Sequence, residues 1–411
     1  MTQASERLPA YSLFAALLAA AGLPIYIHAP KFYVDEYGVS LAALGAVLFG
    51  LRLLDVVQDP LLGKLAERVR DRRAGAVAIG CAVIGGAMVA LFAIPPLLPP
   101  LVWFGLTLTL VFSAFSFLTI NFYAQGVMKG AGLAGKGHLR LARWRESGAL
   151  LGVCVAAVAP VALAAAFEAP FAWFALGFAG LAVGAAYAMR SEWSTAGLAA
   201  STGFGVVLRD GLARRLLLIA LVNAAPVAVS STLFLFFVES KLDAPGYEGP
   251  LLLVFFLSAA VAAPFWGAMA ERFGPKRVLI VAMVLAICAF GLTLTLGPGD
   301  WALFALICVA SGATLGADLT LLPAIFADRM ARISPSAAEG FGLWSFVSKL
   351  TLAFAAVTLL PVLERAGFQS GGASENTPET LALLALLYAG VPCVLKVVAI
   401  ALLAVTDLSE V

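Results

Sequence analysis

The chain has 411 residues, of which 62% are hydrophobic and 12% are charged, and its net charge is +2. A water-soluble domain is about half apolar and about a quarter charged, so this composition excludes an ordinary soluble protein. The five cysteines lie far apart in apolar stretches, with no metal or disulfide spacing. The chain also has no basic run with interleaved aromatic residues, so we expect no nucleic-acid partner.

Twelve segments are continuously apolar over roughly 20 residues, the length that an α-helix needs to cross a bilayer. Strands of a membrane barrel would instead alternate apolar and polar residues. We therefore predict an all-α integral membrane protein with twelve transmembrane helices. The predicted segments are residues 10–30, 40–63, 75–98, 101–125, 144–166, 171–189, 214–238, 250–270, 276–296, 301–324, 339–363 and 381–405.

The basic residues predict the orientation of these helices. If both termini lie in the cytoplasm, most of the 26 lysine and arginine residues fall in cytoplasmic loops, and only Lys31, Lys241 and Arg365 fall on the opposite side. Cytoplasmic loops of membrane proteins are rich in these residues, so the pattern predicts cytoplasmic termini. Arginine outnumbers lysine and alanine is abundant, which favours a GC-rich bacterium and its inner membrane.

The second predicted helix carries three charged residues at mid-membrane depth. Asp55 and Asp59 are four residues apart and Arg52 precedes Asp55 by three, so all three share one face. Charges at this depth are costly and indicate a functional site. Two carboxylates offer oxygen ligands for a sodium-sized cation; alternatively, one holds a proton, since close like charges repel in a low dielectric. The structural alternative is an ion network that only locks helices together.

The loops after the second and eighth helices share a Gly-x-x-x-Glu-Arg pattern followed by two basic residues. Because these loops lie about half the chain length apart, they predict two six-helix halves with a mid-membrane substrate site between them. We expect the halves to be residues 1–189 and 214–411, joined by a cytoplasmic linker at 190–213. The conformational loop motif consists of Gly63, Glu67, Arg68, Gly267, Glu271 and Arg272.

Two lysines lie within the last two predicted helices. Lys349 has about ten apolar or small residues on either side. We expect it to face the central cavity and to pair with the carboxylates of the second helix, in a charge network that includes Arg52. Lys396 is nearer the end of its helix, and we expect it to snorkel to the surface or to pair locally.

These motifs resemble those of the major facilitator superfamily and, within it, the glycoside–pentoside–hexuronide cation symporters, which include the melibiose carriers. The loop motif is similar to the superfamily's Gly-x-x-x-Asp-Arg signature, with Glu in place of Asp. The motif of the second helix is the most specific feature, and the resemblance covers nearly the whole chain. The matching segments are residues 32–38, 52–60, 322–328 and 339–349.

The resemblance implies that Asp55 and Asp59 bind the coupling cation, Na⁺ or H⁺, and that Lys349 lies near them. We assign Gln58 and Thr119 to the same cation-coupling group. Apart from a coupling Na⁺, we expect no metal, and we expect no cofactor.

The chain departs from the melibiose branch at two positions, where Ala19 and Thr119 replace sugar-binding acids. The expected cavity is therefore less negative and suits a neutral sugar or a sugar acid. Aromatic faces beside hydrogen-bonding groups suit a sugar ring. The predicted substrate-binding residues are Tyr26, Thr119, Tyr123, Arg145, Trp344 and Lys349.

We therefore expect a monomeric secondary transporter in the lipid bilayer, which couples a small polar solute such as a sugar, glycoside or sugar acid to a cation by alternating access. One alternative is a proton-driven exporter or a transporter of lipid-like solutes on the same fold. A second is a membrane receptor that does not transport, which would need a docking domain that neither tail nor loop is long enough to form. The chain has no phosphate loop, nucleophile elbow or metal cluster, so we do not expect an enzyme.

Overall fold

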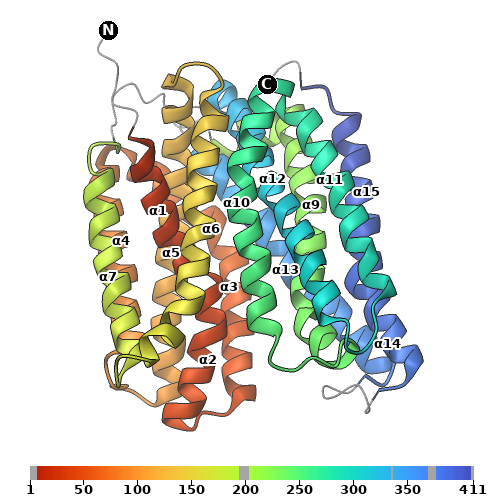
Figure 1. Ribbon diagram of the computed structural model, residues 1–411. Helices are drawn as coiled ribbons and strands as arrows, with labels where there is room; N and C mark the ends of the chain where they lie inside the picture. The colour runs from red at the N-terminus through yellow and green to blue at the C-terminus, as the bar shows by residue number, and fades with distance from the viewer. Residues whose placement is uncertain (1–6, 194–202, 335–336, 369–375, 409–411) are drawn as a thin grey trace. The chain divides into compact units, whose positions relative to one another are not determined.

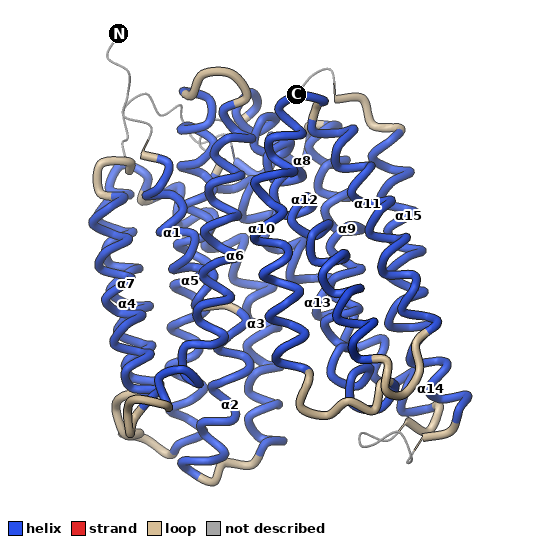
Figure 2. The backbone as a smooth tube through the Cα atoms, viewed as in Figure 1, coloured by secondary structure: helices blue, strands red, loops and turns tan. Residues whose placement is uncertain are grey.

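The computed structural model describes residues 7–193, 203–334, 337–368 and 376–408, which form helices joined by short loops (Figure 1, Figure 2). The first helices are α1 (Leu8–Ala20), α2 (Leu23–Tyr37), α3 (Leu41–Arg68), η1 (Arg70–Arg72), α4 (Arg73–Phe92), α5 (Pro100–Gly132), α6 (Gly137–Ala164), α7 (Pro170–Met189) and α8 (Gly203–Arg209). The later helices are α9 (Gly211–Phe236), η2 (Phe237–Lys241), α10 (Glu248–Phe273), α11 (Pro275–Gly291), η3 (Leu292–Thr295), α12 (Trp301–Ile333), α13 (Ala338–Arg365), α14 (Pro378–Ala385), η5 (Leu386–Gly390) and α15 (Val391–Ala404).

Each of the twelve predicted segments overlaps one helix or a run of two or three consecutive helices, which confirms the all-α membrane fold. Within the described residues, nine helical segments are long and apolar enough to cross a membrane, and α1 is a shorter apolar helix. Two of the remaining segments are α3, which carries the charged motif, and α13.

The first predicted segment is two helices rather than one. α1 ends at Ala20, and α2 begins at Leu23 and continues to Tyr37. The break follows from Gly22, which is outside helical geometry at ψ −117°, and from Pro24 in the first turn of α2. Gly38 follows the last residue of α2, and its φ of 61° is the left-handed conformation that commonly ends a helix.

The chain falls into two compact units. Unit 1 consists of Met1–Val207 and Met330–Phe346, and unit 2 consists of Leu208–Arg329 and Val347–Val411. The first unit therefore includes the start of α13, and the boundary near the middle of the chain lies within α8. The predicted division at a linker of residues 190–213 stays a prediction.

Within unit 1, α1 lies along α6, α4 packs between α5 and α7, and α3 packs on α5. The α1–α6 contact is close because Gly148 and Gly152, one turn apart on α6, face the backbone of Ser12 and Ala16. A Cβ atom at either glycine would overlap that backbone. Small residues at this spacing allow membrane helices to approach closely.

Within unit 2, α9 packs on α15, and α11 packs on both α10 and α15. Two of its helical segments contain π turns, at Phe237–Lys241 and at Leu386–Gly390. The rings of Phe237 and Tyr388, one from each π turn, stack at 4.3 Å with an angle of 14°. This contact ties the end of α9 to the start of α15.

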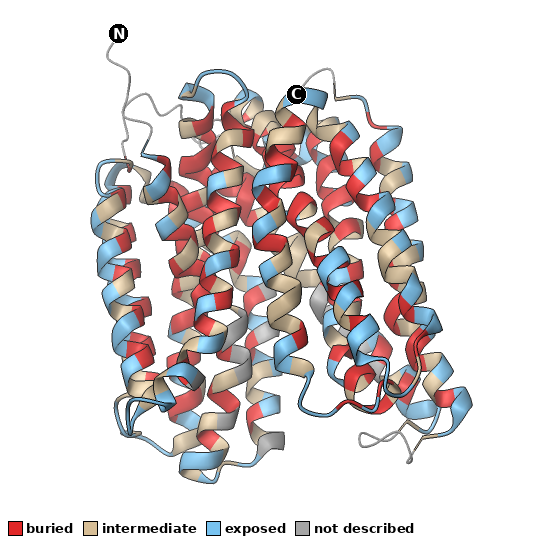
Figure 3. Cartoon of the chain, viewed as in Figure 1, coloured by how far each residue is buried: buried red, intermediate tan, exposed pale blue. Residues whose placement is uncertain are grey.

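Exposed and buried residues alternate along the helices, as Figure 3 shows. On α7, Phe174 and Phe178 are buried, whereas Leu176 and Val183 on another face are exposed. Contiguous exposed apolar side chains are rare on soluble monomers and are expected on a helix that faces a bilayer.

Candidate functional site

The two aspartates of α3 are both buried in unit 1. Asp55 is 5% exposed and Asp59 is 0% exposed. They lie one helical turn apart, so the i, i+4 spacing brings both to one face as predicted. Pro60 follows directly inside the same helix and lacks the N–H that would bond one turn back.

Polar side chains from three helices surround this acid pair. Nε2 of Gln58 donates a hydrogen bond of 2.7 Å to Oδ1 of Asp55, and Oε1 of Gln58 accepts one of 2.9 Å from Ser113 on α5. Oγ of Ser345, in the part of α13 that belongs to unit 1, donates a 2.5 Å bond to Oδ2 of Asp59. Carboxylate, amide and hydroxyl oxygens are the ligands that hard cations prefer.

Thr119, the fourth predicted cation-coupling residue, is partly buried on α5. Its Oγ1 is buried and has no hydrogen-bond partner among the described residues. A buried hydroxyl without a partner is costly, so this oxygen is available to a ligand.

Arg145 and Tyr123 form a second cluster in unit 1. The Arg145 guanidinium lies 4.0 Å from the centre of the Tyr123 ring, and both groups bond to Glu146. The Arg145 Nε donates to Glu146 Oε1 at 2.7 Å, and the Tyr123 hydroxyl donates to the same oxygen at 3.3 Å. The Arg145 Nη2 is buried without a hydrogen-bond partner in the described part of the chain. The cluster therefore offers an aromatic face and an open cationic donor.

Trp344 is joined to this cluster through Phe341. The Phe341 ring lies 5.0 Å from that of Tyr123 and 6.5 Å from that of Trp344. Three of the six predicted substrate-binding residues, Tyr123, Arg145 and Trp344, are thus brought into one neighbourhood.

Three predicted positions are not placed with these clusters. The side chains of Tyr26 and Arg52 lie outside the described part of the structure. Lys349 is partly buried on α13, in unit 2. Its pairing with the acids of α3 therefore stays a prediction.

The first loop motif lies where α3 meets α13. A Cβ atom at Gly63 would be 3.3 Å from the Ala338 carbonyl oxygen and 3.5 Å from the Gly342 Cα, so the backbones nearly touch. Glu67 is buried and accepts a 3.1 Å bond from Arg70, whereas Arg68 is exposed. In the second motif Gly267 is buried, Glu271 is partly buried and Arg272 is exposed.

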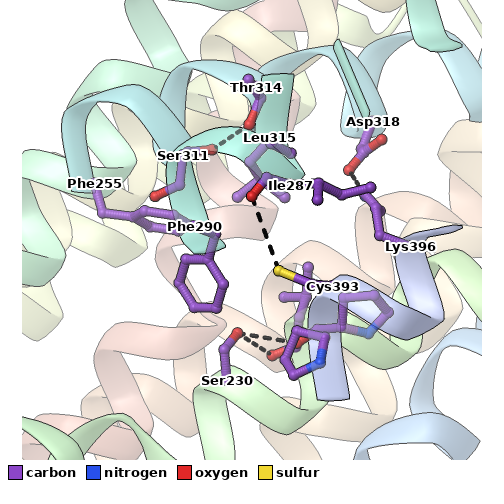
Figure 4. Close-up of a pocket in the computed structure, with 14 residues that line it drawn as sticks. Ser230, Phe255, Ile287, Phe290, Ser311, Thr314, Leu315, Asp318, Cys393 and Lys396 are labelled. Atoms are coloured by element: carbon purple, nitrogen blue, oxygen red, sulfur yellow. Dashed lines mark hydrogen bonds and ion pairs between the residues drawn. The ribbon is translucent and has the colours of Figure 1, made fainter. Parts of the chain in front are cut away.

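A third charged cluster lies in unit 2 and corrects the expectation for Lys396. This lysine is 5% exposed, so it does not snorkel to the surface. Its Nζ donates to Asn223 at 2.8 Å and to Asp318, and the latter pair is drawn in Figure 4. Asp318 lies 78 residues away on α12, so the pairing is not local either. The pair borders a small, mostly apolar cavity (Figure 4).

Sequence reasoning missed Glu146, Ser113 and Asp318. Glu146 comes after Arg140, Arg143 and Arg145, so the segment was interpreted as a basic loop. Its position directly after Arg145 could have indicated an ion pair. Ser113 and Asp318 have no local motif, because each bonds a residue more than fifty positions away.

A family model described as MFS/sugar transport protein matches residues 10–410. The chain belongs to this family. The match confirms the resemblance to the glycoside–pentoside–hexuronide symporters of the major facilitator superfamily, and it makes the chain a multi-pass membrane transporter rather than an enzyme.

Solved structures agree on the fold. A bacterial homologue of the iron transporter ferroportin, in an outward-facing state, is similar with a TM-score of 0.69 and 14% identity, over 96% of this chain and 99% of that chain. A mutant of the nucleoside transporter NupG is similar with a TM-score of 0.61 and 15% identity, over 96% of this chain and 98% of that chain. A comparison with curated proteins found no match.

Proposed function

We propose that this member of the MFS/sugar transport family is a symporter that moves a small hydroxylated solute, such as a sugar, glycoside or sugar acid, together with Na⁺ or H⁺. The observation that carries the proposal is the buried acid pair Asp55 and Asp59. Buried carboxylates in a membrane helix are costly unless they bind a partner or a coupling ion.

The chemistry around the pair supports cation binding. Gln58 bonds Asp55 through Nε2 and Ser113 through Oε1. Separately, the Ser345 hydroxyl donates to Asp59. A cation that displaces the Ser345 hydroxyl from Asp59 would find carboxylate oxygens, the amide oxygen of Gln58 and the hydroxyl oxygen of Ser113 as ligands. A proton on either carboxylate would remove the repulsion between two close negative charges.

The proposed solute site is the cluster of Tyr123, Arg145 and Trp344, completed by Thr119, Tyr26 and Lys349. A sugar ring has apolar faces and a polar rim, which suit an aromatic face beside hydrogen-bond donors. The open Nη2 of Arg145 would donate to either a hydroxyl or a carboxylate oxygen. We also propose an inner-membrane location with cytoplasmic termini, which the basic loops favour.

Uptake into proteoliposomes tests the proposal. Purified protein is reconstituted, and accumulation of labelled sugars and sugar acids is measured under an inward Na⁺ gradient, an inward H⁺ gradient, or neither. We expect one gradient to drive accumulation, and we expect Asp55→Asn and Asp59→Asn each to abolish it. Solute equilibration without a gradient can survive in these variants, since coupling and solute binding use different side chains.

The matched control is Glu364→Gln, which removes an exposed acid near the end of α13. This variant should accumulate solute as the unmodified protein does. Normal accumulation by both aspartate variants would overturn the coupling assignment. Outward transport of amphipathic compounds in place of sugar uptake would favour the exporter.

A further inference from the structure

A basic cavity lies at the end of unit 2 where α9 begins and α15 ends. It has a volume of about 590 Å³, and its lining includes Arg214 and Arg215 on the first turn of α9 and Asp407 after α15. Both arginines are exposed, and the structure gives neither of them an ion pair or hydrogen bond with another described side chain. Among the described residues, the lining therefore carries two exposed guanidinium groups and one carboxylate.

Two further negative features near this cavity have partners. Asp210, which precedes α9, is held by Arg329 through bonds of 3.1 Å from Nε and 2.5 Å from Nη2. The carbonyl groups at the end of α15 would carry the negative end of that helix dipole. Lys276 occupies them, because its Nζ donates to Ala404 at 2.9 Å and to Thr406 at 2.6 Å.

The length and apolar composition of α9 lead us to expect the cavity at a membrane interface. α9 is long and apolar enough to span a bilayer, and the two arginines stand at its first turn. Leu218, one turn further along the helix, also borders the cavity and is 46% exposed. A ligand here would place a polar group against the arginines and an apolar group along the helix. Clusters of basic residues at this position attract anionic lipid head groups.

We propose that this cavity binds the phosphate of an anionic phospholipid, held by Arg214 and Arg215, with an acyl chain along Leu218. The planar guanidinium group bonds two phosphate oxygens at once, which an ammonium group does not. A zwitterionic lipid carries a cation beside its phosphate, and the second positive charge would oppose the arginines. The proposal is independent of solute transport and of the acid pair on α3.

Native mass spectrometry of the purified protein tests it. The probes are phosphatidylglycerol, phosphatidylcholine with the same acyl chains, and inorganic phosphate. We expect the protein to retain phosphatidylglycerol at least ten-fold more tightly than phosphatidylcholine. The variant Arg214→Gln/Arg215→Gln should lose that preference. Arg214→Lys/Arg215→Lys keeps the positive charges but loses the planar guanidinium groups. Its preference for phosphatidylglycerol should lie between that of the unmodified protein and that of the glutamine variant.

The matched control is Arg72→Gln/Arg277→Gln, which removes two exposed arginines at other helix ends. This variant should bind phosphatidylglycerol as the unmodified protein does. Equal binding of the two lipids, or unchanged preference in the Arg214→Gln/Arg215→Gln variant, would overturn the proposal. Displacement of phosphatidylglycerol by an equal concentration of inorganic phosphate would also overturn it, because the site would then recognise free phosphate.

Discussion

Ser345 and Asp59 are joined by a 2.5 Å hydrogen bond between α13 and α3, although they lie 286 residues apart in the sequence. Beside it, a Cβ atom at Gly342 would lie 3.3 Å from the Asp59 carbonyl oxygen and 3.3 Å from the Gly63 Cα. The proposed coupling residue is therefore bonded to a second helix at a point where the two backbones nearly touch.

This bond predicts an effect of Ser345 on the coupling cation. Ser345→Ala removes a donor that occupies Asp59, so the cation no longer competes with it. Hydrogen bonds to charged groups contribute about 1.5–3 kcal/mol, so we expect the cation concentration for half-maximal uptake to fall by roughly ten-fold or more. Ser345→Thr retains the hydroxyl and serves as the control. Identical cation dependence in Ser345→Ala and Ser345→Thr would show that the bond does not limit cation binding.

The close approach of α1 and α6 predicts a stability effect. In Gly152→Ala the added methyl group would overlap the Ala16 backbone, so the helices must separate. Overpacking of this kind costs about 1–3 kcal/mol. Thermal unfolding in detergent should show a lower midpoint for Gly152→Ala. Gly184→Ala on α7, where a Cβ atom meets no other atom within 4 Å, should leave the midpoint unchanged. A midpoint equal to that of Gly184→Ala would contradict the predicted contact.

Glu146 is predicted to be the partner that makes Arg145 tolerable inside unit 1. Their side chains are 8% and 7% exposed. Glu146→Gln leaves a buried guanidinium without its anion, which costs about 3–5 kcal/mol. We therefore expect Glu146→Gln to lower the unfolding midpoint more than the double variant Arg145→Gln/Glu146→Gln does. A double variant that is less stable than Glu146→Gln would show that the two charges act separately.

Asp210 predicts a pH dependence outside the membrane-spanning segments. Hydrogen bonds from Arg329 hold the pKa of the Asp210 carboxyl below its ordinary value of 3.8. The carboxylate therefore contributes stability above pH 4, and this contribution disappears as the pH falls below 3.8 through the lowered pKa. Asp210 also caps α9 by accepting from the Ala213 N–H at 2.7 Å.

The measurement is thermal unfolding of Asp210→Asn between pH 7 and pH 3. At pH 7 we expect the free energy of unfolding of this variant to be lower by about 1 kcal/mol or more, because the ion pair is lost and the cap is weakened. This difference from the unmodified protein should become smaller toward pH 3. Asp71→Asn, at a side chain that is 81% exposed, is the control. A deficit of the same size at both pH values would mean that the charge of Asp210 is unimportant.

The sequence predicted the spanning helices well because an apolar run of bilayer length leaves few other structures possible. It did not predict the break between α1 and α2, because averaging over about 20 residues hides the local effect of Gly22 and Pro24. The burial of Asp55 and Asp59 could be predicted, because these charged residues lie inside an apolar run. The serines around them could not be predicted, because Ser113 and Ser345 come from distant helices and have no motif of their own.

The environment of Lys396 also could not be predicted from the sequence. Distance from the helix end suggested that its ammonium group could reach the surface, but the direction of the side chain decides the outcome. Direction depends on helix phase, and the π turn in the same helical segment cannot be read from hydrophobicity.

The π turn Leu386–Gly390 limits how the segment formed by α14, η5 and α15 can gain or lose residues. A π turn holds one residue more than an α turn, so the residues beyond it are rotated by about 100° relative to an uninterrupted α-helix. Lys396 follows six residues later and reaches Asp318 only in this rotated phase. A one-residue deletion in the turn would thus act as a rotation, swinging the ammonium group away from its carboxylate. We expect relatives that lack this residue to have lost the lysine and the aspartate together.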